Sequence, residues 1–439
     1  MKLKYGQTVR IGFAFLAICA FWQMYNNVIP LMLTNTFQMS ETWSGMIMAA
    51  DNVFAVFLLP FFGNLSDRCT SSLGKRKPYI LAGTILSVIL MMFLPFLDNR
   101  YAASPAGILM VLFVAVLCLL LFSMGTYRSP AVALMPDVTP KPLRSRGNAV
   151  INLMGAIGGI VYLIIAAVLY PESRTRGAAH VDYFPLFLFI AAIMIIALFI
   201  VLFTIDENRL AREARSFNEK YDAEEEKAAA SSVSPHIKRS LLFLLLSVFF
   251  WFTGYNAVET WFTVYAQKSW GMGIGSASLC LTIATGGAIL SYMPVAAIAS
   301  KIGRKKTILL GVALLCASFF SMFLYSAARN SFHPALYALF CVIGFSWAAI
   351  NVNSLPMVLE MCKDQDIGKF TGYYYAFSMS AQIVTPVLAG FLLNRAGYHS
   401  LFPYSAAFSL VALLTMLFVK HGDTRNISKK GLEAFDVED

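Results

Sequence analysis

Twelve long apolar stretches run through this 439-residue chain, and they constrain its fold more than any other feature. A helix needs roughly 20 mostly apolar residues to cross the hydrocarbon core of a bilayer. Charged residues make up only 13% of the chain, about half their share in a soluble domain. Because a bilayer offers the backbone no hydrogen-bonding partners, we predict an all-α membrane protein with twelve transmembrane helices. The predicted spans cover residues 9–34, 42–65, 78–98, 107–136, 146–170, 184–204, 239–266, 275–300, 306–326, 334–361, 369–394 and 401–419.

The basic residues predict how the chain is oriented in the membrane, because lysine and arginine concentrate in cytoplasmic loops. With the N-terminus inside and the loops assigned alternately, 27 of the 34 Lys and Arg residues fall on the cytoplasmic side. We therefore expect both termini in the cytoplasm and a multi-pass protein of the plasma membrane (the inner membrane of a bacterial cell). The net charge of +10 then needs no nucleic-acid partner. The outer side holds Arg100, Arg174, Arg176, Lys268, Arg329 and Arg395, and Arg128 lies near or inside the membrane.

A basic, glycine-containing hairpin occurs twice, which indicates an internal duplication. Gly74-Lys75-Arg76-Lys77 follows the second predicted span, and Gly303-Arg304-Lys305-Lys306 follows the eighth. Each half also contains a Phe-Trp pair and a Tyr-Asn pair in its first span, and an acid at the end of its fourth. We predict two pseudo-symmetric six-helix halves, residues 1–204 and 239–420, joined by a cytoplasmic linker at 205–238 and followed by a cytoplasmic tail at 421–439. Such duplicated halves enclose a substrate site near the bilayer midplane in many carriers.

Polar side chains on the predicted spans mark the candidate substrate site. Spans 1, 2, 4, 5, 7, 8, 10 and 11 carry polar groups, whereas spans 3, 6, 9 and 12 are much more apolar. Amides pair with hydroxyl groups and aromatic rings stack on sugar rings, so the amide and aromatic residues would suit a polyhydroxylated ligand. The alternative is that they hold helices together. The substrate-binding candidates are Gln23, Asn26, Asn27, Asn148, Asn152, Trp251, Tyr255, Asn256, Trp347, Asn351, Asn353, Tyr375 and Gln382.

Three charged residues inside predicted spans are candidates for proton coupling. A carboxylate at the centre of a membrane helix costs about 2.5–3.5 kcal/mol, so Asp51 and Glu259 need a function or a partner. The Arg128 guanidinium stays charged and would pair with an acid or with ligand hydroxyls. The alternatives are structural acids for Asp51 and Glu259, and for Arg128 a side chain that reaches the cytoplasmic edge.

Charged residues at the predicted cytoplasmic ends of the spans form a candidate gate. We expect their ion pairs to hold the inner side closed and to break as the halves rock. The gate candidates are Asp67, Arg68, Arg76, Asp137, Arg144 and Arg146.

Two motifs resemble those of sucrose–proton symporters and their bacterial relatives. They are Gly63-x-x-Ser66-Asp67-Arg68-Cys69-Thr70-Ser71-x-x-Gly74-Lys75-Arg76-Lys77-Pro78, and Pro130-x6-Asp137 followed by Arg144-x-Arg146-x-Asn148-Ala149. With the twelve-span layout, the resemblance covers essentially the whole chain. It implies the major facilitator fold, alternating access and proton-coupled uptake of a disaccharide or other glycoside.

The chain departs from the plant symporters at one position. Those proteins carry a membrane-embedded aspartate sixteen residues before the position that matches Asp137, and Leu121 stands there in this sequence. Asp51 or Glu259 would then bind the proton, or the protein would be an uncoupled facilitator.

The resulting prediction is a secondary active transporter of a sugar or glycoside that works as a monomer in the bilayer, with the proton as coupling ion. An efflux carrier for amphipathic compounds and a transporter-derived sensor are the alternatives. The seven cysteines include no Cys-x-x-Cys, and the chain has no His/Cys ligand cluster, nucleophile elbow or phosphate loop. We therefore expect no metal, no cofactor and no enzymatic activity.

Overall fold

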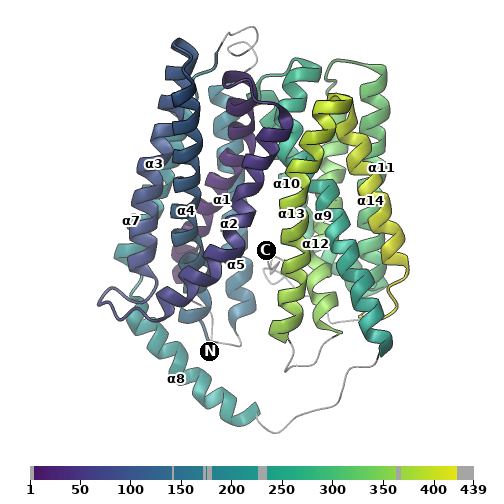
Figure 1. Cartoon of the computed structure of the whole chain (residues 1–439). Helices are drawn as coiled ribbons and strands as arrows, with labels where there is room; N and C mark the ends of the chain where they lie inside the picture. The colour runs from purple at the N-terminus through teal and green to yellow at the C-terminus, as the bar shows by residue number, and fades with distance from the viewer. Residues whose placement is uncertain are drawn as a thin grey trace. The chain divides into compact units, whose positions relative to one another are not determined.

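The computed structural model describes residues 4–140, 143–171, 175, 180–225, 235–361 and 367–422. Twelve helices within these ranges are long and apolar enough to span a membrane, which confirms the predicted number. An additional helix, α8, lies in the predicted linker (Figure 1). The elements are α1 (Tyr5–Leu31), η1 (Met32–Thr36), α2 (Glu41–Asp67), α3 (Lys77–Ala103), α4 (Gly107–Val138), α5 (Arg144–Leu169), α7 (Phe184–Thr204), α8 (Glu207–Glu225), α9 (Pro235–Trp270), α10 (Ile274–Ile302), α11 (Arg304–Ala328), α12 (Leu336–Leu359), α13 (Ile367–Ala396), η4 (Tyr398–Ser400) and α14 (Leu401–Leu417).

The chain forms two compact units. Unit 1 consists of Met1–Gln38, Ala50–Leu169 and Gly177–Ala229, and unit 2 of Met39–Ala49, Tyr170–Arg176 and Ala230–Asp439. These units correspond to the predicted halves except that the linker divides between them and two short segments join unit 2.

The segment Met39–Ala49 groups with unit 2 because its backbone packs directly on α13. A Cβ atom on Gly45 would lie 2.2 Å from the Pro386 carbonyl oxygen, and one on Gly390 would lie 2.4 Å from the Glu41 carbonyl oxygen. The Tyr398 hydroxyl also donates a hydrogen bond to the Glu41 carboxylate.

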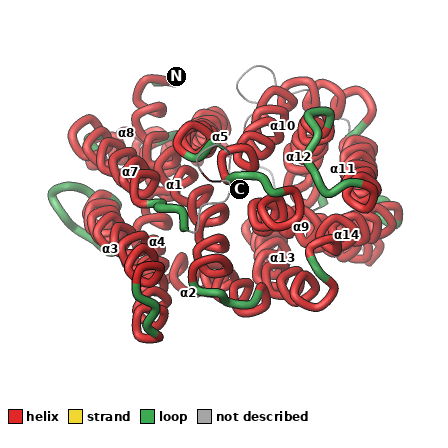
Figure 2. Tube along the Cα trace, turned by 90° about the horizontal axis from the view of Figure 1, so that it is seen from above, coloured by secondary structure: helices red, strands yellow, loops and turns green. Residues whose placement is uncertain are grey.

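The same helix pairings recur in both units, as a duplication requires. In unit 1, α1 packs on α5 and α7, and α3 packs on α4 and α7. In unit 2, the corresponding helices repeat this arrangement, with α9 on α13 and α14, and α11 on α12 and α14. Seen end-on, α3 lies beside α4 in one bundle and α11 beside α14 in the other (Figure 2).

Glycine allows the closest of these helix contacts. A Cβ atom on Gly158 of α5 would lie 2.0 Å from the Leu16 carbonyl oxygen of α1, and one on Gly344 of α12 would lie 1.9 Å from the Ala284 carbonyl oxygen of α10. Small residues that let helix backbones meet are typical of membrane bundles.

Candidate functional site

A buried arginine organises one end of unit 1. The Arg76 Nε donates a hydrogen bond of 2.7 Å to the Asp137 carboxylate, and the other guanidinium nitrogens contact the Asp67 carboxylate, the Ser66 hydroxyl and the Gly63 carbonyl oxygen. Burial opposes the charge on Arg76, but the hydrogen bond and charge of Asp137, followed by those of Asp67, raise its pKa above the ordinary value. We call Asp67, Arg76 and Asp137 the Arg76 network; it joins the ends of α2, α3 and α4.

The other three gate candidates are Arg68, Arg144 and Arg146. The Arg144 Nε donates to the Thr139 carbonyl oxygen at 3.3 Å, which links the start of α5 to the end of α4. Arg68 and Arg146 are exposed on the surface of unit 1.

Unit 2 contains a related ion pair. Arg304, at the start of α11, forms an ion pair with Glu360, which directly follows α12. The preceding glycines, Gly74 and Gly303, both adopt positive φ angles of 113° and 95°, where residues with a side chain are strained. Arg304 and Glu360 are further gate candidates that the repeated hairpin in the sequence could have indicated.

Two of the three proton-coupling candidates come together in unit 1. The Asp51 carboxylate accepts hydrogen bonds from the backbone N–H and side-chain amide of Asn52, at 2.6 and 2.8 Å. It also interacts electrostatically with Arg128 of α4 and Tyr25 of α1. The Arg128 guanidinium lies 5.5 Å from the ring centre of Trp22, within cation–π range.

The amide candidates of unit 1 differ in their burial and in whether their amide groups are already hydrogen-bonded within the protein. Asn27 is fully buried, and its Nδ2 donates to the carbonyl oxygen of Gln23 at 2.7 Å, so this amide is engaged by its own helix. Gln23 packs at Gly159 of α5, where a Cβ atom would lie 3.3 Å from its Cγ. The half-buried candidates are Gln23, Asn26, Asn148 and Asn152.

An aromatic stack forms the centre of the candidate site in unit 2. The rings of Tyr255 on α9 and Trp347 on α12 stack 3.8 Å apart at an angle of 6°. Phe252 meets Trp347 edge-on at 5.2 Å. Asn256 beside Tyr255 is 9% exposed, and its Nδ2 has no hydrogen-bond partner among the described residues. Glu259 interacts electrostatically with Tyr255.

The remaining candidates of unit 2 separate into packed and partly exposed residues. Trp251 has no exposed surface and lies in the interior of the unit. Asn353 is also buried, and its Nδ2 donates to the Ala349 carbonyl oxygen at 2.9 Å. Asn351, Tyr375 and Gln382 are half-buried.

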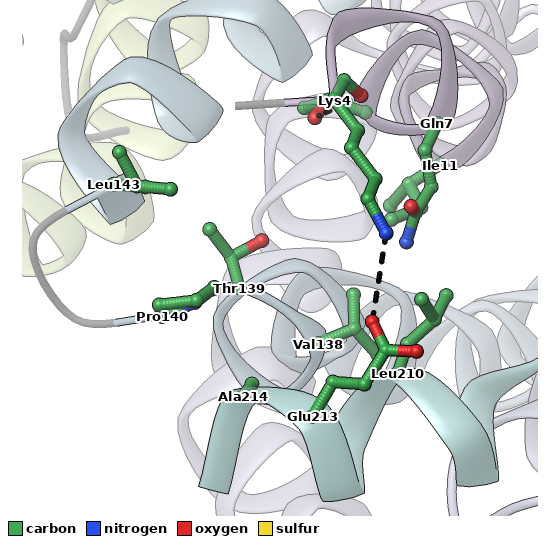
Figure 3. Close-up of a pocket in the computed structure, with 11 residues that line it drawn as sticks. Lys4, Gln7, Ile11, Val138, Thr139, Pro140, Leu143, Leu210, Glu213 and Ala214 are labelled. Atoms are coloured by element: carbon green, nitrogen blue, oxygen red, sulfur yellow. Dashed lines mark hydrogen bonds and ion pairs between the residues drawn. The ribbon is translucent and has the colours of Figure 1, made fainter. Parts of the chain in front are cut away.

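The described residues also form a pocket where α1, the end of α4 and α8 meet (Figure 3). The Lys4 ammonium group and the Glu213 carboxylate face each other across it, 3.5 Å apart. No predicted site residue lines it, and the described residues contain no group of His, Cys, Asp and Glu that would hold a metal ion.

Sequence comparison relates the chain to membrane transporters. A family model described as Major Facilitator Superfamily matches residues 11–328 and 266–437. The chain is 28% identical over 194 residues to the uncharacterized protein YqgE of Bacillus subtilis (strain 168), covering 43% of this chain and 44% of that protein. It is 29% identical over 138 residues to sucrose transport protein SUC3 of Arabidopsis thaliana, covering 29% of this chain and 23% of that protein. The matched region spans less than half of either relative.

Structural comparison identifies the same fold. The nucleoside transporter NupG superposes with a TM-score of 0.67 at 14% identity, covering 95% of this chain and 100% of that one. The inward-open xylose transporter XylE from E. coli gives 0.65 at 16% identity, covering 97% of each chain. Because these proteins carry different substrates, the likeness establishes the architecture only, and the substrate has to be argued from the site residues.

Proposed function

The chain belongs to the major facilitator superfamily, and we propose that this multi-pass membrane transporter carries a sugar or glycoside by proton-coupled symport. The observation that carries the proposal is the Tyr255–Trp347 stack, together with Asn256, which follows Tyr255 in the sequence and whose Nδ2 has no hydrogen-bond partner among the described residues. Aromatic faces pack against the C–H faces of a sugar ring, and an unpaired amide hydrogen-bonds hydroxyl groups. The likeness of part of the chain to sucrose transport proteins supports the same substrate class.

Alternating access would expose the substrate to one side of the membrane at a time. We propose that the Arg76 network of unit 1 and the Arg304–Glu360 pair of unit 2 stabilise the state that is closed on the cytoplasmic side. The strong bias of Lys and Arg toward one set of loops supports cytoplasmic termini. Plasma-membrane location and a monomeric state belong to the same proposal.

Asp51 is the leading candidate for the coupling proton. The carboxylate lies inside α2, and Arg128 is a positive charge near enough to respond to its protonation. Protonation would release Arg128 from this attraction and change the polarity of the face that includes Trp22. Leu121, at the position where plant symporters have an aspartate, favours uncoupled facilitation as the second candidate function.

Uptake by the purified protein in liposomes tests the substrate class. Labelled disaccharides and monosaccharides would be compared with nucleosides and peptides, with and without an inward proton gradient. We expect accumulation of one sugar or glycoside, and Trp347→Ala should weaken its apparent affinity at least tenfold. Uptake of nucleosides or peptides but of no sugar would contradict the proposal.

Two carboxylate variants test the coupling. One proton driven by 100 mV supplies about 2.3 kcal/mol, enough for roughly fiftyfold accumulation. Asp51→Asn should abolish accumulation but retain exchange of labelled for unlabelled substrate, with Glu259→Gln tested in parallel. Asp98→Asn is the matched control, because Asp98 is a buried carboxylate on α3 whose recorded ion-pair partner is His180, which is not a candidate residue. Uptake by the wild type that only equilibrates would establish the facilitator.

A further inference from the structure

Glu207, the first residue of α8, forms three long-range hydrogen bonds to the backbone of the first hairpin. Its Oε1 accepts hydrogen bonds from the backbone N–H groups of Lys75 and Arg76, at 2.7 and 2.8 Å. Its Oε2 accepts one from the N–H of Lys77 at 3.1 Å. The residue is only 3% exposed and lies about 130 positions away in sequence from its partners.

The Glu207 carboxylate provides hydrogen-bond acceptors for backbone N–H groups at the start of α3. The first N–H groups of a helix have no partner within the helix, and they favour a negative charge through the helix dipole. Lys77 is the first residue of α3, so Glu207 binds the three successive N–H groups that lead into this helix. Hydrogen bonds to a charged acceptor are about twice as strong as those between neutral groups.

The hairpin backbone is shaped to admit this carboxylate. Gly74 has a φ angle of 113°, and a Cβ atom there would lie 2.3 Å from the Glu207 Oε2 and 2.5 Å from its Cδ. The neighbouring Asn208 side chain donates to the Ser72 carbonyl oxygen at 2.9 Å. The beginning of α8 is therefore attached to the hairpin by four hydrogen bonds.

The same backbone carries Arg76, whose guanidinium holds Asp67 and Asp137. Glu207 binds the backbone N–H of Arg76, while the Arg76 side chain reaches to Asp67 of α2 and Asp137 of α4. We infer that Glu207 is a positioning residue, through which α8 holds Arg76 in reach of its two carboxylate partners. A displacement of α8 would then be transmitted to the Arg76 network. The inference rests on the proposed role of that network, but its test involves no substrate and no proton gradient.

Cys69 offers a native reporter of the network. It follows α2 by two residues, it is half-buried, and its N–H donates to the Ser66 carbonyl oxygen at 3.2 Å. Loss of the Arg76–Asp67 contact should release the end of α2 and expose this thiol. The rate of maleimide labelling at Cys69 would be followed by peptide mass spectrometry on the full-length protein.

Four variants separate positioning from a general structural role. Glu207→Ala should speed labelling of Cys69 by about tenfold, the scale of lost hydrogen bonds to a charge. Glu207→Gln keeps the shape of the side chain but replaces one acceptor oxygen by an NH2 group, so Cys69 should be labelled at an intermediate rate. Arg76→Ala should match Glu207→Ala, and the double variant should label no faster than Arg76→Ala alone. Glu213→Gln, which removes an exposed carboxylate from the same helix, should label like the wild type.

Cys280, fully buried in unit 2, provides the folding control within each sample. Cys280 should stay unlabelled in the folded protein. If it reacts in Glu207→Ala, that variant is misfolded, and the labelling rate of Cys69 is compared between the wild type and Glu207→Gln. An unchanged Cys69 rate in both Glu207 variants, or effects of Glu207 and Arg76 that multiply in the double variant, would overturn the inference.

Discussion

The close contact between α10 and α12 at Gly344 predicts how much stability the variant Gly344→Ala loses. The added Cβ would lie 1.9 Å from the Ala284 carbonyl oxygen and 2.8 Å from the Ala288 nitrogen, whereas ordinary contact begins at 3.4 Å. Both obstacles are helix backbone, which cannot rotate away as a flexible side chain would. The two helices must therefore separate by about 1.5 Å, as the difference between these distances shows.

The cost follows from what that separation disrupts. Ala288, Val295, Ala348 and Ala349 form a buried cluster at this contact, with Tyr292 packed against it. Inserting a methylene into a well-packed core typically costs about 1–3 kcal/mol, and the backbone obstacle places Gly344→Ala near the upper value. For a unit of roughly 200 residues this corresponds to a fall in Tm of about 6–12 °C.

The assay is thermal unfolding in detergent at a fixed scan rate, with Gly286→Ala as the matched control. Gly286 lies on α10, one partner in the same contact, and a Cβ there would meet nothing within 4 Å. Replacing it should leave Tm unchanged or raise it, since alanine favours helix over glycine by about 1 kcal/mol. Equal Tm values for the two variants would refute the argument from backbone contact. Because Trp347 follows Gly344 by one helical turn, weaker substrate affinity should accompany the loss of stability.

Three further predictions concern pH, the aromatic stack and the second hairpin. Partial burial lowers the pKa of His180 below its ordinary value. The folded protein therefore binds this proton less readily than the unfolded chain, and stability is lost as pH falls below about 6.5. Between pH 7.5 and 5.5, Tm should fall less in His180→Gln than in the wild type, and an equal fall would contradict this. Tyr255→Phe retains the stacked ring, so it should keep most of the affinity that Trp347→Ala loses, as direct binding of the transported sugar would show. Removing the charge of Arg304 with Arg304→Ala leaves Glu360 without the ion pair that the structure records, and we expect transport to fall at least fivefold while surface expression is retained.

Apolar length and repetition were sufficient to predict the architecture. The twelve spans could be recognised because each must match the bilayer thickness, a requirement that acts on local composition alone. The second hairpin indicated the duplication, and each unit pairs an arginine of its hairpin with a carboxylate at the end of its fourth span, Arg76 with Asp137 and Arg304 with Glu360. The predicted linker at 205–238 contains α8, which spans Glu207–Glu225.

The sequence alone determined which segments cross the membrane, how they repeat and which residue types could meet a polar solute, because these properties depend on composition and spacing. Only the tertiary structure decided which contacts each side chain makes. Asn27 and Asn26 are neighbours on one helix, yet the amide of Asn27 is held by its own helix, and no periodicity specifies a rotamer. Glu207 resembled one more solvated acid in a charged linker, since the three N–H groups that it binds lie about 130 residues away. Contacts between such distant segments arise from the packing of helices, so a residue's partner is settled only when the bundle has formed.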